Sequence, residues 1–195
     1  METFAENNSQ IFDKIVTLRA DLDVPIESLK NDYYIKDYYK INNLIPSIKE
    51  ILEQKPKLLV IISHLGNPKG KYVDRLSLYP IKNYIALRLN KKIKFVSDYY
   101  PLVDLSTYRG ILMLENIKFI PEEENIVKEN TLGKFLSRFT DTYVNEAYNY
   151  CSDNLTSITK IESEHRLAGK LLRKELNKND SIKDLPGLKI LNGNL

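Results

Sequence analysis

Short apolar runs rich in β-branched residues alternate along the chain with longer segments whose apolar residues recur at helical spacing. The short runs predict five strands, over Lys14–Leu18, Leu58–Ile62, Ile93–Val96, Ile111–Leu114 and Thr142–Val144. The longer segments predict helices over Ile41–Gln54, Leu78–Leu89 and Leu132–Phe139. Strands that alternate with helices are typical of βαβ units, so we expect an α/β fold with a parallel sheet and right-handed crossovers.

The C-terminal part of the chain has a different pattern. Ile161–Leu176 predicts one more amphipathic helix, because its apolar residues again recur at helical spacing. The polar stretch that follows is typical of a linker. Leu188–Leu191 then predicts the start of another strand.

Composition and charge exclude several classes of protein. The 195 residues are 43% hydrophobic and 28% charged, which is typical of one globular domain, and no run is long and apolar enough to span a membrane. A single cysteine and the lack of a signal-peptide pattern predict a cytoplasmic location. The net charge of +3 does not indicate a nucleic-acid partner. We expect the paired tyrosines to lie at the surface: Tyr33-Tyr34, Tyr38-Tyr39 and Tyr99-Tyr100.

Polar residues follow four of the predicted strands. Ligands bind outside the carboxyl ends of the strands of an open parallel sheet, where these residues should converge. The sequence therefore predicts a binding crevice at this edge. The residues that follow the four strands are Arg19, Asp21 and Asp23; His64; Glu115, Asn116 and Lys118; and Asn145 and Glu146.

Five motifs in the same order resemble those of one enzyme family. LRADLDVP (Leu18–Pro25) resembles LRVDFNVP, and SHLGNPKG (Ser63–Gly70) matches SHLGRPKG at seven of eight positions. Lys40–Lys49 resembles RI…LPTIK, Leu112–Phe119 resembles LLLENLRF, and DTYVNEAY (Asp141–Tyr148) resembles D.YVNDAF. The chain thus resembles the N-terminal, 3-phosphoglycerate-binding half of phosphoglycerate kinase.

The resemblance implies a fold, domain boundaries and which domain binds which ligand. It implies a three-layer, Rossmann-like open parallel sheet with helices on both faces. Residues 1–176 would form the N-terminal domain, with 161–176 as the interdomain helix. Residues 177–195 would be a linker and the truncated start of the nucleotide domain. No cofactor is then expected on this chain, because the family binds Mg-ATP with the other domain. The expected partners are 3-phosphoglycerate and a separate nucleotide-binding half.

The family's substrate residues carry over with several changes. Lys40 stands where the family has its catalytic arginine, Lys118 and Asn67 also replace arginines, and Asp153 aligns with an arginine of GTAHRAH. Lysine keeps the charge of arginine but not its bidentate fork, and an aspartate reverses the charge. Binding of 3-phosphoglycerate is therefore predicted to be weak or lost. The implied substrate-binding residues are Asp21, Asp23 (an asparagine in the family), Lys40, His64, Asn67, Lys118 and Asp153, with Arg19 in support.

Several of these residues also fit simpler structural roles. Arg19 could face the substrate or pair with Asp21 or Asp23, and the loop around His64 could be kept only for its turn. We interpret Glu122–Glu124 as surface charges that open a helical stretch, not as a metal site. Cys151 with His165 is a weak basis for a nucleophile pair, because no third orienting group is evident.

Two classes of function follow from the sequence. The first is the acid-binding half of a phosphoglycerate kinase-like enzyme, inactive as an isolated chain. The second is a non-catalytic remnant or interaction module with a degraded substrate site. A generic nucleotide-binding protein is disfavoured, because neither GxGxxG nor GxxxxGK[ST] occurs.

Overall fold

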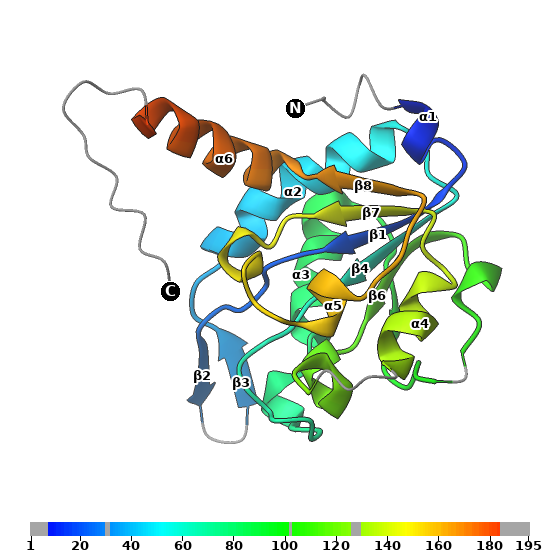
Figure 1. Cartoon of the computed structure of the whole chain (residues 1–195). Coiled ribbons are helices and arrows are strands. Elements are labelled where there is room, and N and C mark those ends of the chain that lie inside the picture. The colour runs from blue at the N-terminus through cyan, green and yellow to red at the C-terminus, as the bar shows by residue number, and fades with distance from the viewer. Residues whose placement is uncertain (1–7, 30–31, 102, 126–129, 184–195) are drawn as a thin grey trace.

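A six-stranded parallel sheet forms the centre of the computed structural model, which describes residues 8–29, 32–101, 103–125 and 130–183 (Figure 1). The strands lie in the order β5-β6-β4-β1-β7-β8, and every neighbouring pair is parallel. Two more strands form an antiparallel hairpin after β1. The strands are β1 (Ile15–Arg19), β2 (Ile26–Leu29), β3 (Asp32–Ile35), β4 (Leu58–Ile62), β5 (Lys94–Val96), β6 (Gly110–Leu114), β7 (Thr142–Asn145) and β8 (His165–Ala168).

Helices cover both faces of the sheet and make a three-layer structure. On one face, α2 (Tyr39–Glu53) contacts α3 (Tyr79–Leu89) and α6 (Lys170–Lys183). On the other face, α4 (Thr131–Ser137) packs next to the short α5 (Thr156–Thr159), and α1 (Asn8–Ile11) precedes the first strand. The remaining helices are of the 3₁₀ type: η1 (Asp74–Leu76), η2 (Leu105–Thr107), η3 (Ile117–Phe119), η4 (Pro121–Glu123) and η5 (Tyr148–Tyr150).

Alternate strand residues point into two separate cores. Leu18 of β1 packs with Leu44 and Ile48 of α2, whereas Ile15 packs in the cluster that contains Phe135 of α4. All five residues of β4 are buried, because helices cover both faces of this central strand. Covering on both faces is the physical reason why LLVII lacks polar alternation.

The sequence prediction of the fold class is confirmed. The sheet is α/β and Rossmann-like, and each of the five predicted strands and three predicted helices occurs within one or two residues of its expected bounds. The β2–β3 hairpin was not predicted, because its short, polar sequence has no clear alternation.

The prediction of a single helix over Ile161–Leu176 is wrong. β8 occupies part of this segment, and α6 begins only at Lys170. Ile161 packs in the core that contains α4, whereas Leu167 packs against the core on the other face of the sheet. The apolar residues that matched helical spacing therefore belong to different elements. Backbone hydrogen bonds to β7 stabilise the short edge strand instead.

The predicted linker is also wrong over its first residues, because α6 continues to Lys183. The predicted strand Leu188–Leu191 lies outside the described residues. Tyr99, expected at the surface, is 3% exposed and packs near Phe135. None of the helices in the described parts of the chain has the length and apolar character to cross a bilayer.

Candidate functional site

The carboxyl ends of β1, β4, β6 and β7 bring most of the predicted polar residues together. Ser63, after β4, accepts a hydrogen bond from the backbone of Leu22, after β1, at 3.1 Å. The carboxylate of Asp23 accepts one from the backbone of Gly66 at 2.8 Å. These contacts join segments that are about forty residues apart, as the rule for open parallel sheets predicts.

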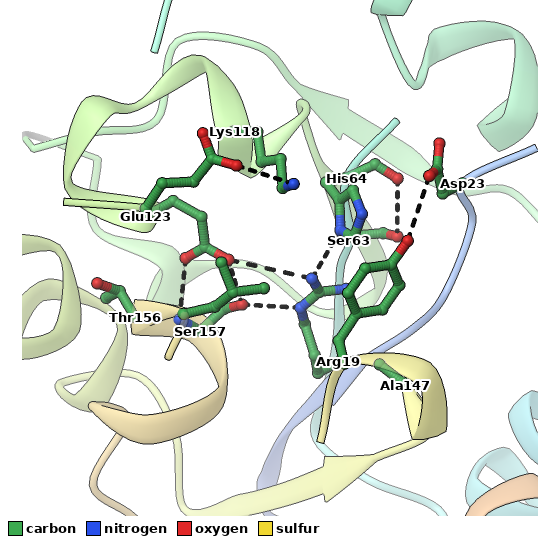
Figure 2. A network of polar contacts seen from close by, with 12 residues as sticks. Arg19, Asp23, Ser63, His64, Lys118, Glu123, Ala147, Thr156 and Ser157 are labelled. Atoms are coloured by element: carbon green, nitrogen blue, oxygen red, sulfur yellow. Dashed lines mark hydrogen bonds and ion pairs between the residues drawn. The ribbon is translucent and has the colours of Figure 1, made fainter. Parts of the chain in front are cut away.

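Arg19, the last residue of β1, is fully buried below this edge (Figure 2). Its Nε donates to Ser157 Oγ at 2.8 Å, and its Nη2 lies 2.8 Å from His64 Nδ1 and 4.0 Å from Glu123 Oε1. The interpretation that Arg19 pairs with Asp21 or Asp23 is therefore wrong, and its buried side chain contacts His64 instead. A buried guanidinium needs a buried counter-charge, and here Glu123 provides it.

Glu123 corrects a second sequence interpretation. It is 0% exposed, not a surface charge, and its two carboxylate oxygens accept hydrogen bonds from the backbone and the hydroxyl of Ser157 at 2.9 and 2.6 Å. Burial raises its pKa, and the charge of Arg19 opposes that shift. The sequence could not indicate that Glu123 is buried, because three consecutive glutamates do not reveal which one points inward.

His64 is 1% exposed and is held by Arg19. An arginine can only donate, so His64 Nδ1 accepts, and the single hydrogen of the neutral ring lies on Nε2. Burial, followed by the charges of Arg19, Lys118 and Lys40, lowers the pKa of His64 to about 2. Nε2 is buried and has no hydrogen-bond partner within the described residues. The ring is therefore a neutral donor without an acceptor.

Tyr150 covers His64 from the segment after β7. Its ring meets the imidazole edge-on, with 4.5 Å between the ring centroids, and its hydroxyl donates to Asp23 Oδ2 at 3.2 Å. The guanidinium of Arg19 lies 6.0 Å from the centre of the same ring. Sequence reasoning missed Tyr150, because nothing in the stretch Asn149–Leu155 marks one side chain as pointing into the site.

The two predicted lysines lie at the same edge, and each is paired with a carboxylate. Lys40 Nζ lies 2.9 Å from Asp21 Oδ2, and the amide of Asn149 donates to the same oxygen at 2.9 Å. Lys118 Nζ lies 2.9 Å from Glu124 Oε1. The charges of both lysines lower the pKa of His64, so both act on the same imidazole. Neither lysine is a solvated surface charge without a partner.

Asn67 and Asp153 are the most peripheral members of the predicted set. Asn67 is exposed and lines a hollow of about 650 Å³ together with Asp23 and Arg75. Asp153 is also exposed, and its hydrogen bonds are made by its backbone, with Tyr150 and Leu155. The structure therefore brings Asp21, Asp23, Lys40, His64 and Lys118 together, while the side chain of Asp153 makes no contact with them in the described residues.

Two further residues that the sequence singled out have structural contacts. Glu146 accepts hydrogen bonds from the backbone of Leu171 and Leu172 and so holds the first turn of α6. Cys151 contacts Asn145 and Ala147, and burial raises its thiol pKa, which disfavours a nucleophilic thiolate. No group of three metal-ligating side chains occurs in the part of the chain that the structure describes.

Comparison with known proteins gives one consistent family. The family model described as phosphoglycerate kinase matches residues 7–193. The phosphoglycerate kinase of Tetrahymena thermophila is 35% identical over 184 residues, which are 85% of this chain and 43% of that protein. That of Tetrahymena pyriformis is 36% identical over 175 residues, 80% of this chain and 46% of that protein. The chain thus spans less than half the length of these relatives.

Solved structures have the same fold. Phosphoglycerate kinase from Coxiella burnetii superposes with a TM-score of 0.77 at 26% identity, over 91% of this chain and 44% of that one. The enzyme from Pyrococcus horikoshii gives a TM-score of 0.71 at 22% identity, over 86% of this chain and 42% of that one, and at this identity it supports the fold alone.

Proposed function

The chain belongs to the phosphoglycerate kinase family, and on this premise we propose that it is the acid-binding half of a kinase of that family. The family reaction, a step of glycolysis, converts ATP and 3-phosphoglycerate to ADP and 1,3-bisphosphoglycerate. The chain would supply the site for the acid, and the nucleotide-binding half of the family would supply the phosphoryl donor. A cytoplasmic location is part of this proposal and rests on the single cysteine.

One observation supports the acid-binding role: the charges of Lys40 and Lys118 both act on the buried, neutral imidazole of His64 at the carboxyl edge of the sheet. Positive charge around a neutral N–H donor is suited to a carboxylate or a phosphate. In phosphoryl transfer, positioning and charge stabilisation do most of the catalytic work, so Lys40 is the candidate for contact with the transferring phosphoryl group. Lys118 and His64 are then the candidates for holding the acid.

The same geometry supports weak binding. Lys40 and Lys118 are each paired with a carboxylate, and Arg19 is buried against Glu123. An acid with about three negative charges would have to displace internal carboxylates or lie beside them. Asn67 adds no charge, and Asp153 adds a negative one at the periphery. We therefore propose that the isolated chain binds 3-phosphoglycerate weakly and has no kinase activity.

We propose that Mg-ATP is bound by the nucleotide-binding half of the family, as the resemblance implies. The sequence contains no phosphate-binding glycine loop of the GxxxxGK[ST] type, which is consistent with this assignment. We assign the nucleotide to the other half and derive no step through it.

The test is a titration of the isolated chain with 3-phosphoglycerate, monitored by thermal unfolding, together with a coupled kinase assay. A ligand stabilises the native state only when its concentration exceeds the dissociation constant, so little shift is expected at millimolar acid. The variant Lys40→Arg/Asn67→Arg/Lys118→Arg should gain a saturable shift, whereas the matched variant Lys82→Arg/Asn83→Arg/Lys91→Arg on α3 and just after it should not. A saturable shift in the unchanged chain would refute weak binding.

A second function is favoured by the cover that Tyr150 places over His64. A site that is filled by its own side chain fits a non-catalytic interaction module as well as a resting enzyme half. The two functions differ in one measurement, the kinase assay with an added nucleotide-binding half. Activity in that mixture supports the enzyme half, and its absence with intact binding between the halves supports the interaction module.

A further inference from the structure

Tyr150 contacts the residues that an acid ligand would need. Its hydroxyl donates to Asp23, its ring covers the imidazole of His64, and the guanidinium of Arg19 lies over the same ring. A side chain that touches three groups of one binding site occupies the space of a ligand. This inference rests on the proposed function, since it concerns the same site.

A buried donor without an acceptor lies beneath this cover. His64 Nε2 carries the hydrogen of the neutral ring and has no partner within the described residues. A buried polar group without a hydrogen-bond partner destabilises the native state, so such groups are rare and call for an explanation. A carboxylate or phosphate oxygen would be a much stronger acceptor for this N–H than an aromatic ring.

Two sequence departures meet in this contact. Asp23 stands where the resembling motif has an asparagine, and Tyr150 stands where an ungapped match to GTAHRAH has a threonine. In the structure the carboxylate of Asp23 accepts the hydrogen bond of the Tyr150 phenol. Asn149 makes the parallel contact with Asp21, at 2.9 Å. The segment after β7 is therefore anchored to both aspartates of the segment after β1.

We propose that Tyr150, held by Asp23, is a specificity-determining residue that fills the acid site and keeps anions from His64. Tyr150 and Asp23 together take the place of a bound acid, because the phenol ring lies against His64 and the carboxylate of Asp23 orients the phenol. Removing the ring exposes the Nε2–H donor, and removing the negative charge of Asp23 as well makes the space beside His64 suitable for an anion.

The first test measures the protonation of His64 by NMR, with His165, the only other histidine, as the internal reference. In the unchanged chain His64 should stay neutral well below the pH at which an exposed histidine titrates. In Tyr150→Thr, water reaches the ring, and the His64 pKa should rise toward its ordinary value of about 6.5. Tyr150→Phe keeps the ring and should leave His64 neutral.

Tyr72→Thr is the matched control, because its hydroxyl also donates to an aspartate, Asp74, at 3.1 Å. Its ring packs on Phe119 and not on a histidine, so His64 should stay neutral in this variant. A His64 that remains neutral in Tyr150→Thr overturns the proposal. An equal change in Tyr72→Thr would overturn it as well.

The second test measures binding of 3-phosphoglycerate and of inorganic phosphate to Asp23→Asn/Tyr150→Thr, with the two single variants completing the cycle. We expect the double variant to bind 3-phosphoglycerate about tenfold more tightly than the unchanged chain does, and each single variant to gain less affinity. No gain in the double variant overturns the proposal. Equal affinity for phosphate and 3-phosphoglycerate would retain the role of Tyr150 but refute the acid proposed as substrate.

A folding defect in Tyr150→Thr would still leave a decisive measurement. Tyr150→Phe removes only the hydroxyl, so the anchor to Asp23 is lost while the ring remains. Amide hydrogen exchange of Cys151, whose N–H bonds to Tyr148 O, should then accelerate, and exchange in β4 should not change. Unchanged exchange at Cys151 overturns the anchoring role of the phenol.

Discussion

The buried, neutral His64 makes the stability of this protein depend on pH in a defined direction. Its native pKa is about 2, lowered first by burial and then by the charges of Arg19, Lys118 and Lys40, whereas an unfolded histidine titrates near 6.5. Between these two values the unfolded state binds more protons than the native state. Stability from this group is therefore complete above pH 6.5 and is lost as the pH falls toward 2.

The size of the effect follows from the unfolded state alone, because native His64 stays neutral over the range used. Lowering the pH from about 7 to about 5 protonates the unfolded histidine and removes about 2 kcal/mol of stability. His64 is 1% exposed, so solvent screening reduces this figure little. This loss is large against the 5–15 kcal/mol that is typical of a domain's total stability.

The measurement is urea unfolding at about pH 7 and about pH 5, for the unchanged chain and for His64→Gln. Glutamine can still accept a hydrogen bond from Arg19 but does not titrate, so the variant should lose about 2 kcal/mol less between the two pH values. His165→Gln is the control, since His165 is partly exposed and pairs with Glu164. If the unchanged chain and His64→Gln lose the same stability, the reasoning about a neutral buried histidine is refuted.

Two other perturbations test the packing around the site. Glu123→Ala leaves Arg19 buried without its counter-charge and should destabilise the protein by about 3–5 kcal/mol in urea unfolding. The control is Glu124→Ala, which removes the partly exposed ion pair with Lys118 and should cost at most about 1 kcal/mol. Equal losses of stability in the two variants would contradict the burial argument. Gly169→Ala would place a methyl group 2.0 Å from the Glu146 carboxyl carbon, so it should displace the carboxylate that caps α6. The free energy of unfolding should fall by more than about 1 kcal/mol, and amide exchange in the first turn of α6 should become faster. Unchanged exchange there would show that α6 does not depend on this cap.

Sequence patterns predicted which edge of the sheet carries the site better than they predicted which side chains contact one another there. The positions after β1, β4, β6 and β7 converge because the carboxyl ends of parallel strands share one edge, and this follows from strand order alone. His64 and Lys118 lie at this edge for that reason, whereas Lys40, in α2, was taken from the family resemblance and joins the edge through its ion pair with Asp21. Asp153 was placed by an ungapped match to a motif, and a loop without regular structure does not keep the direction of a side chain.

Which partner each charge has depended on the tertiary structure. Periodicity reports whether a residue faces a core, but an ion pair depends on distances between segments far apart in the chain. Arg19 lies next to Asp21 in sequence, yet its counter-charge is Glu123, which the turn after β6 carries beneath the sheet edge. Tyr150 likewise lies against His64 only because the fold brings the segment after β7 next to the segments after β1 and β4.

The amino-acid order alone was enough for the α/β class, the family and the edge that carries the site, because local spacing and short motifs encode these. Only the tertiary structure determined that Arg19, Lys40 and Lys118 are paired with carboxylates of the same chain and that Tyr150 covers His64. Such long-range pairings are selected by burial, since a charge or a polar group removed from water must find its partner among whatever the fold brings near.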